Sequence, residues 1–160
     1  MRTREGTLEG RGRRFAVVAS RFNGIVTEKL VEGALAAFRK LGIADDDIEL
    51  AWTPGAFEVP LAAMRLARSG QFDAVVCLGA VIRGETPHFE FVAGEAARGV
   101  QQVALDSGVP CTFGVLTTDS LEQAMDRAGG KHGNKGWDAA IAAVEMAGLL
   151  DDLPKREEKP

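Results

Sequence analysis

The sequence of 160 residues contains no tyrosine, two histidines and two cysteines. Cys77 and Cys111 lie within apolar runs, where a thiol acts as a small hydrophobic side chain. The cysteines and histidines lack the spacing of a metal site, so we expect no structural metal. No apolar run is long enough to span a bilayer, and the N-terminus lacks a signal-peptide pattern. We therefore expect a cytoplasmic protein with no membrane partner.

The chain also lacks an excess of positive charge, because 19 lysines and arginines are outnumbered by 23 aspartates and glutamates and the formal net charge is −4. Affinity for a nucleic-acid backbone depends on clustered lysine and arginine, so a general nucleic-acid binder is excluded. The one basic cluster, Arg11, Arg13 and Arg14, lies beside glycines and is interpreted as a solvated edge. With 46% hydrophobic residues, the chain has the composition of an ordinary globular domain.

The pattern of apolar residues alternates between short continuous runs and helical spacing. Strands are predicted at residues 15–19, 48–52, 74–79 and 109–116. The first predicted helix has its apolar pattern from Leu30 to Leu41 and ends at Gly42. Further helices are predicted at residues 57–68, 89–106, 119–128 and 137–150. Asp119 and Glu122 resemble a capping box at the fourth helix.

Strands that alternate with helices predict an α/β fold with a mainly parallel sheet between two helical layers. No linker or repeat divides the chain, so residues 1–160 are expected to form a single domain, a three-layer α/β/α sandwich. Residues 1–13 precede the first strand, and the charged tail at 151–160 is expected to fray. Ligands bind such sheets beyond the carboxyl ends of the strands, where the loops at 20–23, 53–58 and 79–88 should meet.

The loop at 79–88 is the most informative of the three. Thr86 is a predicted N-cap and Pro87 a predicted first helical residue, and Gly84 would let the backbone approach a ligand. Amides at this helix start could hold a phosphate, although a well-capped helix start would look the same. His88 could move protons near neutral pH, or it could simply bond to a neighbouring loop.

Other candidates have structural alternatives too. Phe22 at the end of a strand could stack on a flat heterocycle or pack within its loop. Glu58 lies in the first turn of its helix, where a carboxylate favours the helix dipole. Arg127 and Lys135 could bind a phosphate, but cations near a helix end are often a solvated face. The glycine-rich stretch between them, at 129–134, suggests close backbone packing or a kink and is not a P-loop.

Five segments occur in the order of one known family. They are SRFN at 20–23, PGAFEVP at 54–60, GAVIRGETPHFEFV at 79–92, FGVLTTDSLEQA at 113–124 and RAGGKHGNKGWDAA at 127–140. Together they cover the chain from about residue 10 to 150, and in this the sequence resembles the lumazine synthases. The resemblance implies a flavodoxin-like fold with a four-stranded parallel sheet, which residues 7–13 of a neighbouring subunit would extend.

The resemblance also implies an activity. Lumazine synthases condense 5-amino-6-(D-ribitylamino)uracil with 3,4-dihydroxy-2-butanone 4-phosphate, and release phosphate and water without a metal or an organic cofactor. This is the penultimate step of riboflavin biosynthesis. Both partners are small molecules.

The resemblance assigns roles to residues of one subunit. Phe22 would stack on the pyrimidine, and His88 would transfer protons. The ribityl chain would lie on Ala56, Phe57 and Glu58, the ring against the backbone of Ala80, Val81 and Ile82, and the phosphate against Glu85 and Thr86.

The adjacent subunit would supply Phe113, Arg127 and Lys135, with Arg127 on the phosphate. Asp138 occupies a position where relatives often have glutamate, which leaves the role of this shorter side chain open. A shared site implies a homo-oligomer built from pentamers. The short pattern at 130–134 favours an icosahedral shell of sixty subunits, which could enclose riboflavin synthase.

Two rival functions belong to other classes. A flavodoxin-type electron carrier needs a hydroxyl-rich phosphate loop after the first strand and aromatic walls, whereas this chain has SRFN there and no tyrosine. A catalytically silent shell protein or ligand-binding homologue would not need Phe22, His88, Arg127 and Lys135. A turnover assay separates these possibilities.

Overall fold

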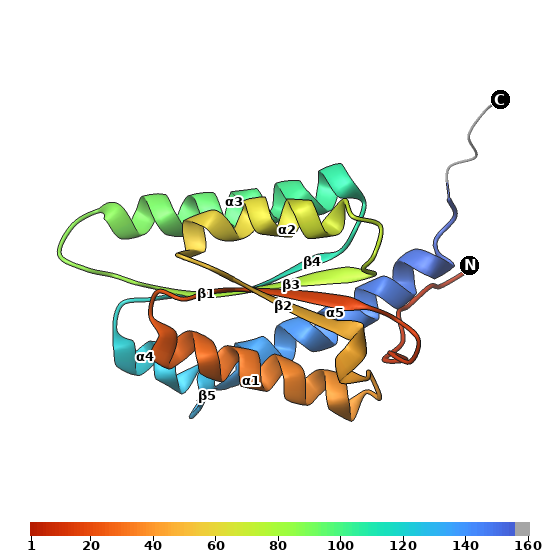
Figure 1. Ribbon diagram of the computed structural model, residues 1–160, viewed down its shortest axis with the longest axis horizontal. Coiled ribbons are helices and arrows are strands. Elements are labelled where there is room, and N and C mark those ends of the chain that lie inside the picture. Colours follow the sequence, from red (N-terminus) through yellow and green to blue (C-terminus); the bar gives the residue numbers. More distant parts are fainter. Residues whose placement is uncertain (156–160) are drawn as a thin grey trace.

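A computed structural model describes residues 1–155 and shows a parallel four-stranded sheet between two layers of helices (Figure 1). The strand order is β2-β1-β3-β4. The strands of this sheet are β1 (Phe15–Ser20), β2 (Ile48–Thr53), β3 (Ala74–Ile82) and β4 (Cys111–Thr118). The predicted α/β fold is therefore confirmed, and the order is that of the flavodoxin-like sandwich.

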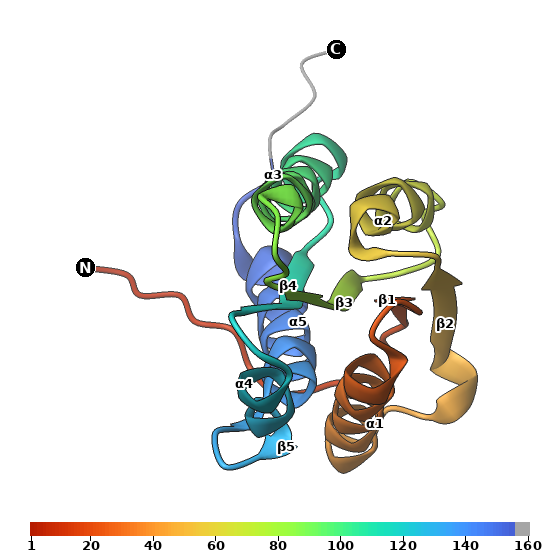
Figure 2. The same cartoon turned by 90° about the vertical axis from the view of Figure 1, so that its left-hand side faces the viewer.

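Different helices form the two layers that cover the sheet. One face of the sheet is covered by α1 (Gly24–Lys40), α4 (Leu121–Asp126) and α5 (Lys135–Asp152). The other face is covered by α2 (Val59–Ala67) and α3 (His88–Ser107), as Figures 1 and 2 show. Short 3₁₀ turns, η1 (Asp45–Asp47) and η2 (Ala56–Glu58), precede β2 and α2. Among residues 1–155, no helix combines the length and the apolar character needed to cross a membrane.

Burial on both faces of the sheet explains why the sequence of β1 is a continuous apolar run. All six of its residues are buried, and alternate side chains serve opposite faces. Phe15 and Val17 pack in the cluster with α1 and α5, and Ala16 and Val18 pack in the cluster with α2 and α3. The rings of Phe15 and Phe38 stack at 4.8 Å between centroids. Two-sided burial selects against the polar alternation of a half-exposed strand.

The two cysteines behave as apolar core residues. Cys77 on β3 is fully buried, and Cys111 at the start of β4 is half-buried. Burial raises the pKa of Cys111 to about 11 and that of Cys77 well above its ordinary value, with the nearby Cys111 adding to the latter shift. Both thiols therefore stay protonated at neutral pH, which fits packing rather than nucleophilic chemistry.

Some element boundaries differ from the predicted ones. β3 continues to Ile82, so Ala80, Val81 and Ile82 lie on a strand, and the loop begins only at Arg83. The predicted N-cap at Thr86 is wrong, because α3 begins at His88 and no side chain caps it. Pro87 holds the cap position, and its carbonyl accepts the N–H of Glu90 at 3.0 Å. A backbone hydrogen bond, without a side-chain cap, therefore closes the first turn of α3.

The predicted capping box at the fourth helix is also wrong. Ser120 is the N-cap of α4, and its Oγ accepts the N–H of Gln123 at 3.1 Å. The Asp119 carboxylate instead accepts a hydrogen bond from Arg83. Because α4 begins at Leu121, the cap position falls on Ser120, one residue later than predicted.

The glycine-rich stretch forms a small hairpin that the sequence did not predict. Its strands are β5 (Ala128–Gly130) and β6 (Gly133–Asn134). Helix α5 follows at Lys135, earlier than predicted, because the Asn134 side chain caps it by accepting the N–H groups of Gly136 and Trp137. The helix continues to Asp152, so the first residues of the predicted tail are helical, and residues 156–160 lie outside the described part.

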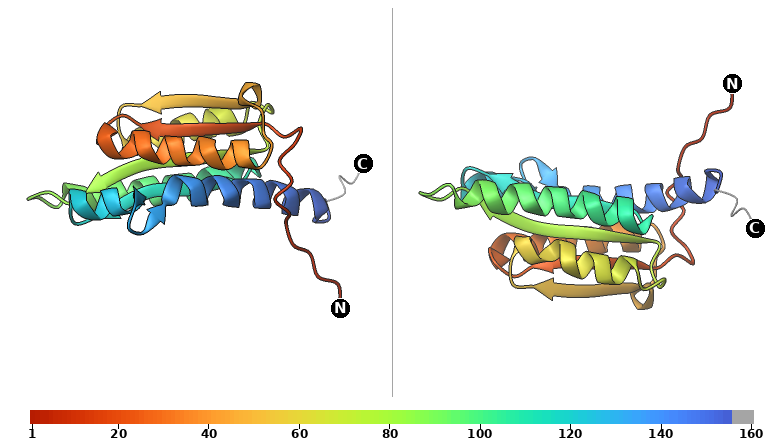
Figure 3. Two further views of the ribbon diagram at one scale, coloured as in Figure 1. Left: turned by 90° about the horizontal axis from the view of Figure 1, so that it is seen from below. Right: turned by 90° about the horizontal axis from the view of Figure 1, so that it is seen from above.

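The N-terminal segment before β1 forms no strand and runs across α5 (Figure 3). Arg13 pairs with Asp151 at 2.7 Å, and Arg4 pairs with Asp152 at 3.1 Å. The predicted solvated edge is thus wrong for Arg13, which contacts the end of α5. Arg14 is likewise engaged, with its guanidinium over the Phe72 ring at 5.4 Å.

Candidate active site

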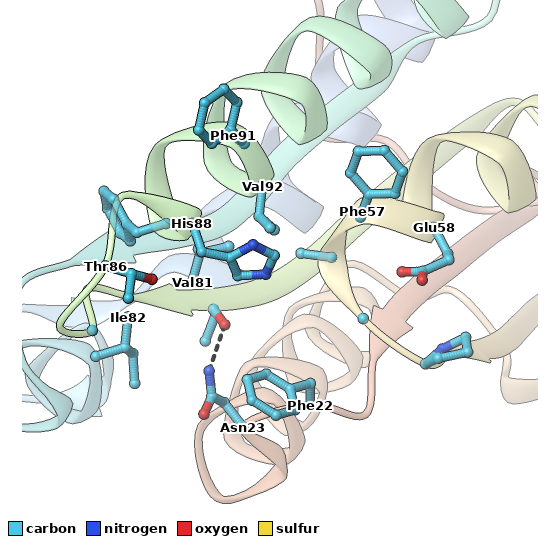
Figure 4. Close-up of a pocket in the computed structure, with 16 residues that line it drawn as sticks. Phe22, Asn23, Phe57, Glu58, Val81, Ile82, Thr86, His88, Phe91 and Val92 are labelled. Atoms are coloured by element: carbon cyan, nitrogen blue, oxygen red, sulfur yellow. Dashed lines mark hydrogen bonds between the residues drawn. The ribbon is translucent and has the colours of Figure 1, made fainter.

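A cavity of about 710 Å³ opens at the carboxyl end of the sheet, above β1 and β3. These are the neighbouring strands between which the chain order reverses, which is where open α/β sheets bind ligands. Figure 4 shows its walls: the end of β1, the turn η2, the end of β3 and the first turns of α3. The lining residues that the sequence predicted are Phe22, Ala56, Phe57, Glu58, Ala80, Val81, Ile82, Thr86 and His88.

Asn23 connects the loop after β1 to the end of β3, and it was not predicted as a site residue. Its backbone is left-handed, with φ of 61°, and its side-chain amide donates to the carbonyl of Ala80 at 2.8 Å (Figure 4). The N–H of Phe22 donates to Pro54 at 3.1 Å, which ties the same loop to the next strand. Asparagine tolerates this conformation better than most residues, so an Asn directly after a strand was the available signal.

Exposed aromatic rings surround the opening. Phe22 is 71% exposed, Phe57 is 59% exposed and Phe91 is 68% exposed. Large apolar side chains gathered at a cavity mark a surface that a ligand or a partner covers. Phe91 was not predicted, because it lies on the exposed side of the helical pattern that placed Phe89 and Val92 in the core. All three of these α3 residues line the cavity.

His88 is the first residue of α3, and its imidazole points into the cavity between Thr86 and the η2 turn that carries Phe57 (Figure 4). Glu58 lies on the far wall in the same turn. Gly84 lines the cavity as well, and a Cβ placed there would meet no atom within 4 Å. The site thus combines an apolar cavity with few polar groups, an arrangement that is suited to binding a flat ring and to transferring a proton.

The other predicted site residues lie outside this cavity. Glu85 is exposed in the loop before α3 and does not line the cavity. Phe113 lies on the edge strand β4 and is 44% exposed. Arg127 follows α4 and Lys135 begins α5, so both belong to the helical layer on the opposite face of the sheet (Figure 1).

The β5–β6 hairpin brings Arg127 and Lys135 together. The N–H of Lys135 donates to the carbonyl of Arg127 at 2.9 Å, although eight positions separate them in the sequence. The Nζ of Lys135 lies 3.5 Å from Oδ2 of Asp138, and Arg127 donates to the carbonyl of Gln123 at 3.0 Å. The hairpin therefore pairs the backbones of Arg127 and Lys135 at the start of α5, while each cationic side chain contacts a partner of its own.

The described residues do not gather into a candidate metal centre: within 1–155, no three His, Cys, Asp or Glu side chains are placed to share one ion. The polar groups of the cavity, the imidazole of His88 and the carboxylate of Glu58 among them, are suited to hydrogen bonding and proton transfer.

Comparison with known proteins agrees with this geometry. The sequence profile of the 6,7-dimethyl-8-ribityllumazine synthase family matches residues 12–151. A 6,7-dimethyl-8-ribityllumazine synthase from Desulfatibacillum aliphaticivorans is 53% identical over 149 residues, which cover 93% of this chain and 96% of that protein. The chain belongs to the 6,7-dimethyl-8-ribityllumazine synthase family.

Proposed function

We propose that the chain catalyses the reaction of its family, the condensation of 5-amino-6-(D-ribitylamino)uracil with 3,4-dihydroxy-2-butanone 4-phosphate. The observation that carries this proposal is the cavity between β1 and β3, with an exposed phenyl ring at its mouth and an imidazole inside. The 53% identity to a synthase of this name supports the same conclusion. In a cytoplasmic setting both substrates would reach the open cavity by diffusion.

The pyrimidine would stack on Phe22, whose exposed ring costs little to cover. The backbone of Ala80, Val81 and Ile82 would bind the ring edge, since this end of β3 forms one wall. The ribityl chain would extend along the η2 turn, Ala56–Glu58, where the carboxylate can accept hydroxyl protons.

The phosphate would lie at the start of α3, against Thr86 and Glu85. Free amides and the helix dipole favour an anion there, and the open space at Gly84 lets the backbone approach it. His88 would transfer protons in the same space.

Arg127, Lys135 and Phe113 would complete the cavity of an adjacent subunit. Their position supports this, because none of the three lines the cavity of its own subunit. The paired cations would hold the phosphate and stabilise it as it leaves.

The reaction then proceeds in balanced steps. The 5-amino group of the uracil attacks the ketone, and water leaves as the imine forms. Loss of a proton from carbon and of phosphate through C–O cleavage gives an enol. After tautomerisation, the ribityl-bearing nitrogen attacks the remaining carbonyl, and a second water leaves as the ring closes. Orientation of two substrates supplies much of the rate in such a sequence.

The direct test mixes the purified protein with both substrates and follows the absorbance of the lumazine and the release of phosphate. The two products should appear in equal amounts. Ligand binding without phosphate release would instead favour a silent homologue.

His88→Ala should slow turnover by about tenfold to a hundredfold without abolishing it, because positioning remains when general acid–base catalysis is lost. The dependence of kcat on pH measures the effect, and the exposed His132 provides a matched control as His132→Ala. Wild-type rates across the pH range in His88→Ala would remove the proton-transfer role.

We also propose a pentamer-based assembly, and we favour an icosahedral shell of sixty subunits large enough to enclose riboflavin synthase. The N-terminal segment at 7–13 forms no strand within its own subunit, which leaves it available to extend a neighbour's sheet at the edge strand β2. Sedimentation should give a mass near sixty subunits. A mass near one pentamer or decamer would exclude the shell, and a monomer would exclude the shared site.

A further inference from the structure

Arg83, the first residue after β3, connects three structural elements through one guanidinium group. Its Nε donates to Oδ1 of Asp119 at 2.9 Å. One terminal nitrogen lies 3.7 Å from Oε1 of Glu90. The guanidinium carbon lies 4.6 Å from the ring centroid of Phe89, in a cation–π contact.

Asp119 is a fixed anchor for this group. It directly follows β4, and its N–H donates to Oε1 of Gln123 at 2.8 Å. Gln123 is itself held, because its N–H donates to the capping hydroxyl of Ser120. The carboxylate therefore projects from a turn that hydrogen bonds hold at both ends.

The other two partners of Arg83 belong to the first turn of α3. Phe89 and Glu90 directly follow His88, and the Phe89 ring lines the cavity and packs on the core beneath α3. The guanidinium thus joins the end of β4 to the helix start that carries the imidazole.

The loop between these anchors has little support of its own. Within residues 1–155, Gly84, Glu85 and Thr86 form no hydrogen bond, and all three are exposed. The backbone of Arg83 fixes one end, where its N–H donates to the carbonyl of Thr118 at 2.8 Å. The geometry of the loop therefore depends on how its two ends are held.

We propose that Arg83 is a positioning residue that sets the phosphate loop at 84–86 and the start of α3 for the reaction. This inference rests on the proposed function, and it assigns to Arg83 no contact with substrate, because its side chain does not line the cavity. Arg83 acts through Asp119 and through the first turn of α3. The planar guanidinium of arginine is needed because a single group must contact two carboxylates and stack on an aromatic ring.

Steady-state kinetics of Arg83→Ala, Arg83→Lys, Asp119→Ala and the double alanine variant test the proposal. Each single variant should raise the KM for the phosphorylated ketone by about tenfold and also lower kcat, because His88 begins the same helix, with the KM for the pyrimidine changing far less. The double variant should be no worse than either single one, because the two residues act as a unit. Thermal melting should match the wild type, since exposed ion pairs contribute little to stability.

The matched control is Arg98→Ala, which removes an exposed arginine that pairs with Glu95 further along α3. Its kinetics should equal those of the wild type. Effects of Arg83 and Asp119 that multiply, rescue by Arg83→Lys, or an unchanged KM in Asp119→Ala would each overturn the positioning role. An inactive wild type would instead overturn the proposed function, so the two failures are distinguishable.

Discussion

Arg127→Ala should lower kcat by about a hundredfold or more, because it removes the cation that we propose stabilises the departing phosphate. The backbone carbonyl of Arg127 accepts the N–H of Lys135, so the variant keeps the lysine of this hairpin and loses only the guanidinium. Lys131→Ala is the matched control, since Lys131 occupies the exposed turn of the same hairpin. Phosphate release measured under saturating substrates should fall only in the Arg127 variant.

Mixed assemblies sharpen this prediction, because the cavity and the cations would come from different subunits. A variant that lacks Phe22 and His88 should also be nearly inactive as a pure oligomer. When it is dissociated and reassembled with Arg127→Ala, some interfaces combine an intact cavity with intact cations. Random mixing in equal amounts should restore about a quarter of the wild-type turnover.

The outcome of mixing separates two arrangements. Recovery of turnover requires that residues of two chains meet at one site. Mixtures that stay as inactive as the pure variants, although gel filtration shows that subunits have exchanged, would place Arg127 and His88 in the same subunit's site. The absence of Arg127 from the lining of the cavity that contains His88 argues against that result.

The central sheet and the cavity were predictable because their signals are local. The apolar run of β1 specifies two-sided burial, and the glycine and proline residues around 54–60 and 84–87 mark the loops at the carboxyl ends. Parallel topology then brings those loops together whatever their exact boundaries. Phe22, Thr86 and His88 meet at the cavity for this reason. Ala80, Val81 and Ile82 also line it, but they were predicted from the resemblance to lumazine synthases.

Long-range polar contacts account for what could not be predicted. Ser120 rather than Asp119 caps α4, and the Asp119 side chain bonds instead to Arg83, which is distant in sequence. The hairpin that aligns Arg127 with Lys135 depends on Asn134, which bonds to the carbonyl of Lys29 on α1 at 2.9 Å. Sequence spacing contains no information on such partners until the packing of α1 against α5 is known.

That packing carries the largest expected effect on stability. Gly136 lies at the start of α5, directly against α1, and a Cβ added there would overlap with the carbonyl oxygen of Leu30 and lie 2.7 Å from its carbonyl carbon. Asn134 occupies the neighbouring space over Gly33, so neither helix can move aside without losing the cap of α5. The contact is between backbones, and no side-chain rotation relieves it.

Gly136→Ala should therefore lower the free energy of unfolding by about 3 kcal/mol or more, or prevent soluble expression, as severe core overpacking does. Gly24→Ala is the matched control, because Gly24 also begins a helix and an added Cβ would be 4.0 Å from the Glu28 carboxylate. Urea unfolding should show that control unchanged or slightly more stable, since alanine favours helices. A Gly136→Ala protein as stable as the wild type would mean that α1 and α5 are separated further than this contact requires. The cation pair beside Gly136 would then lack the rigid support on which the proposed phosphate site depends.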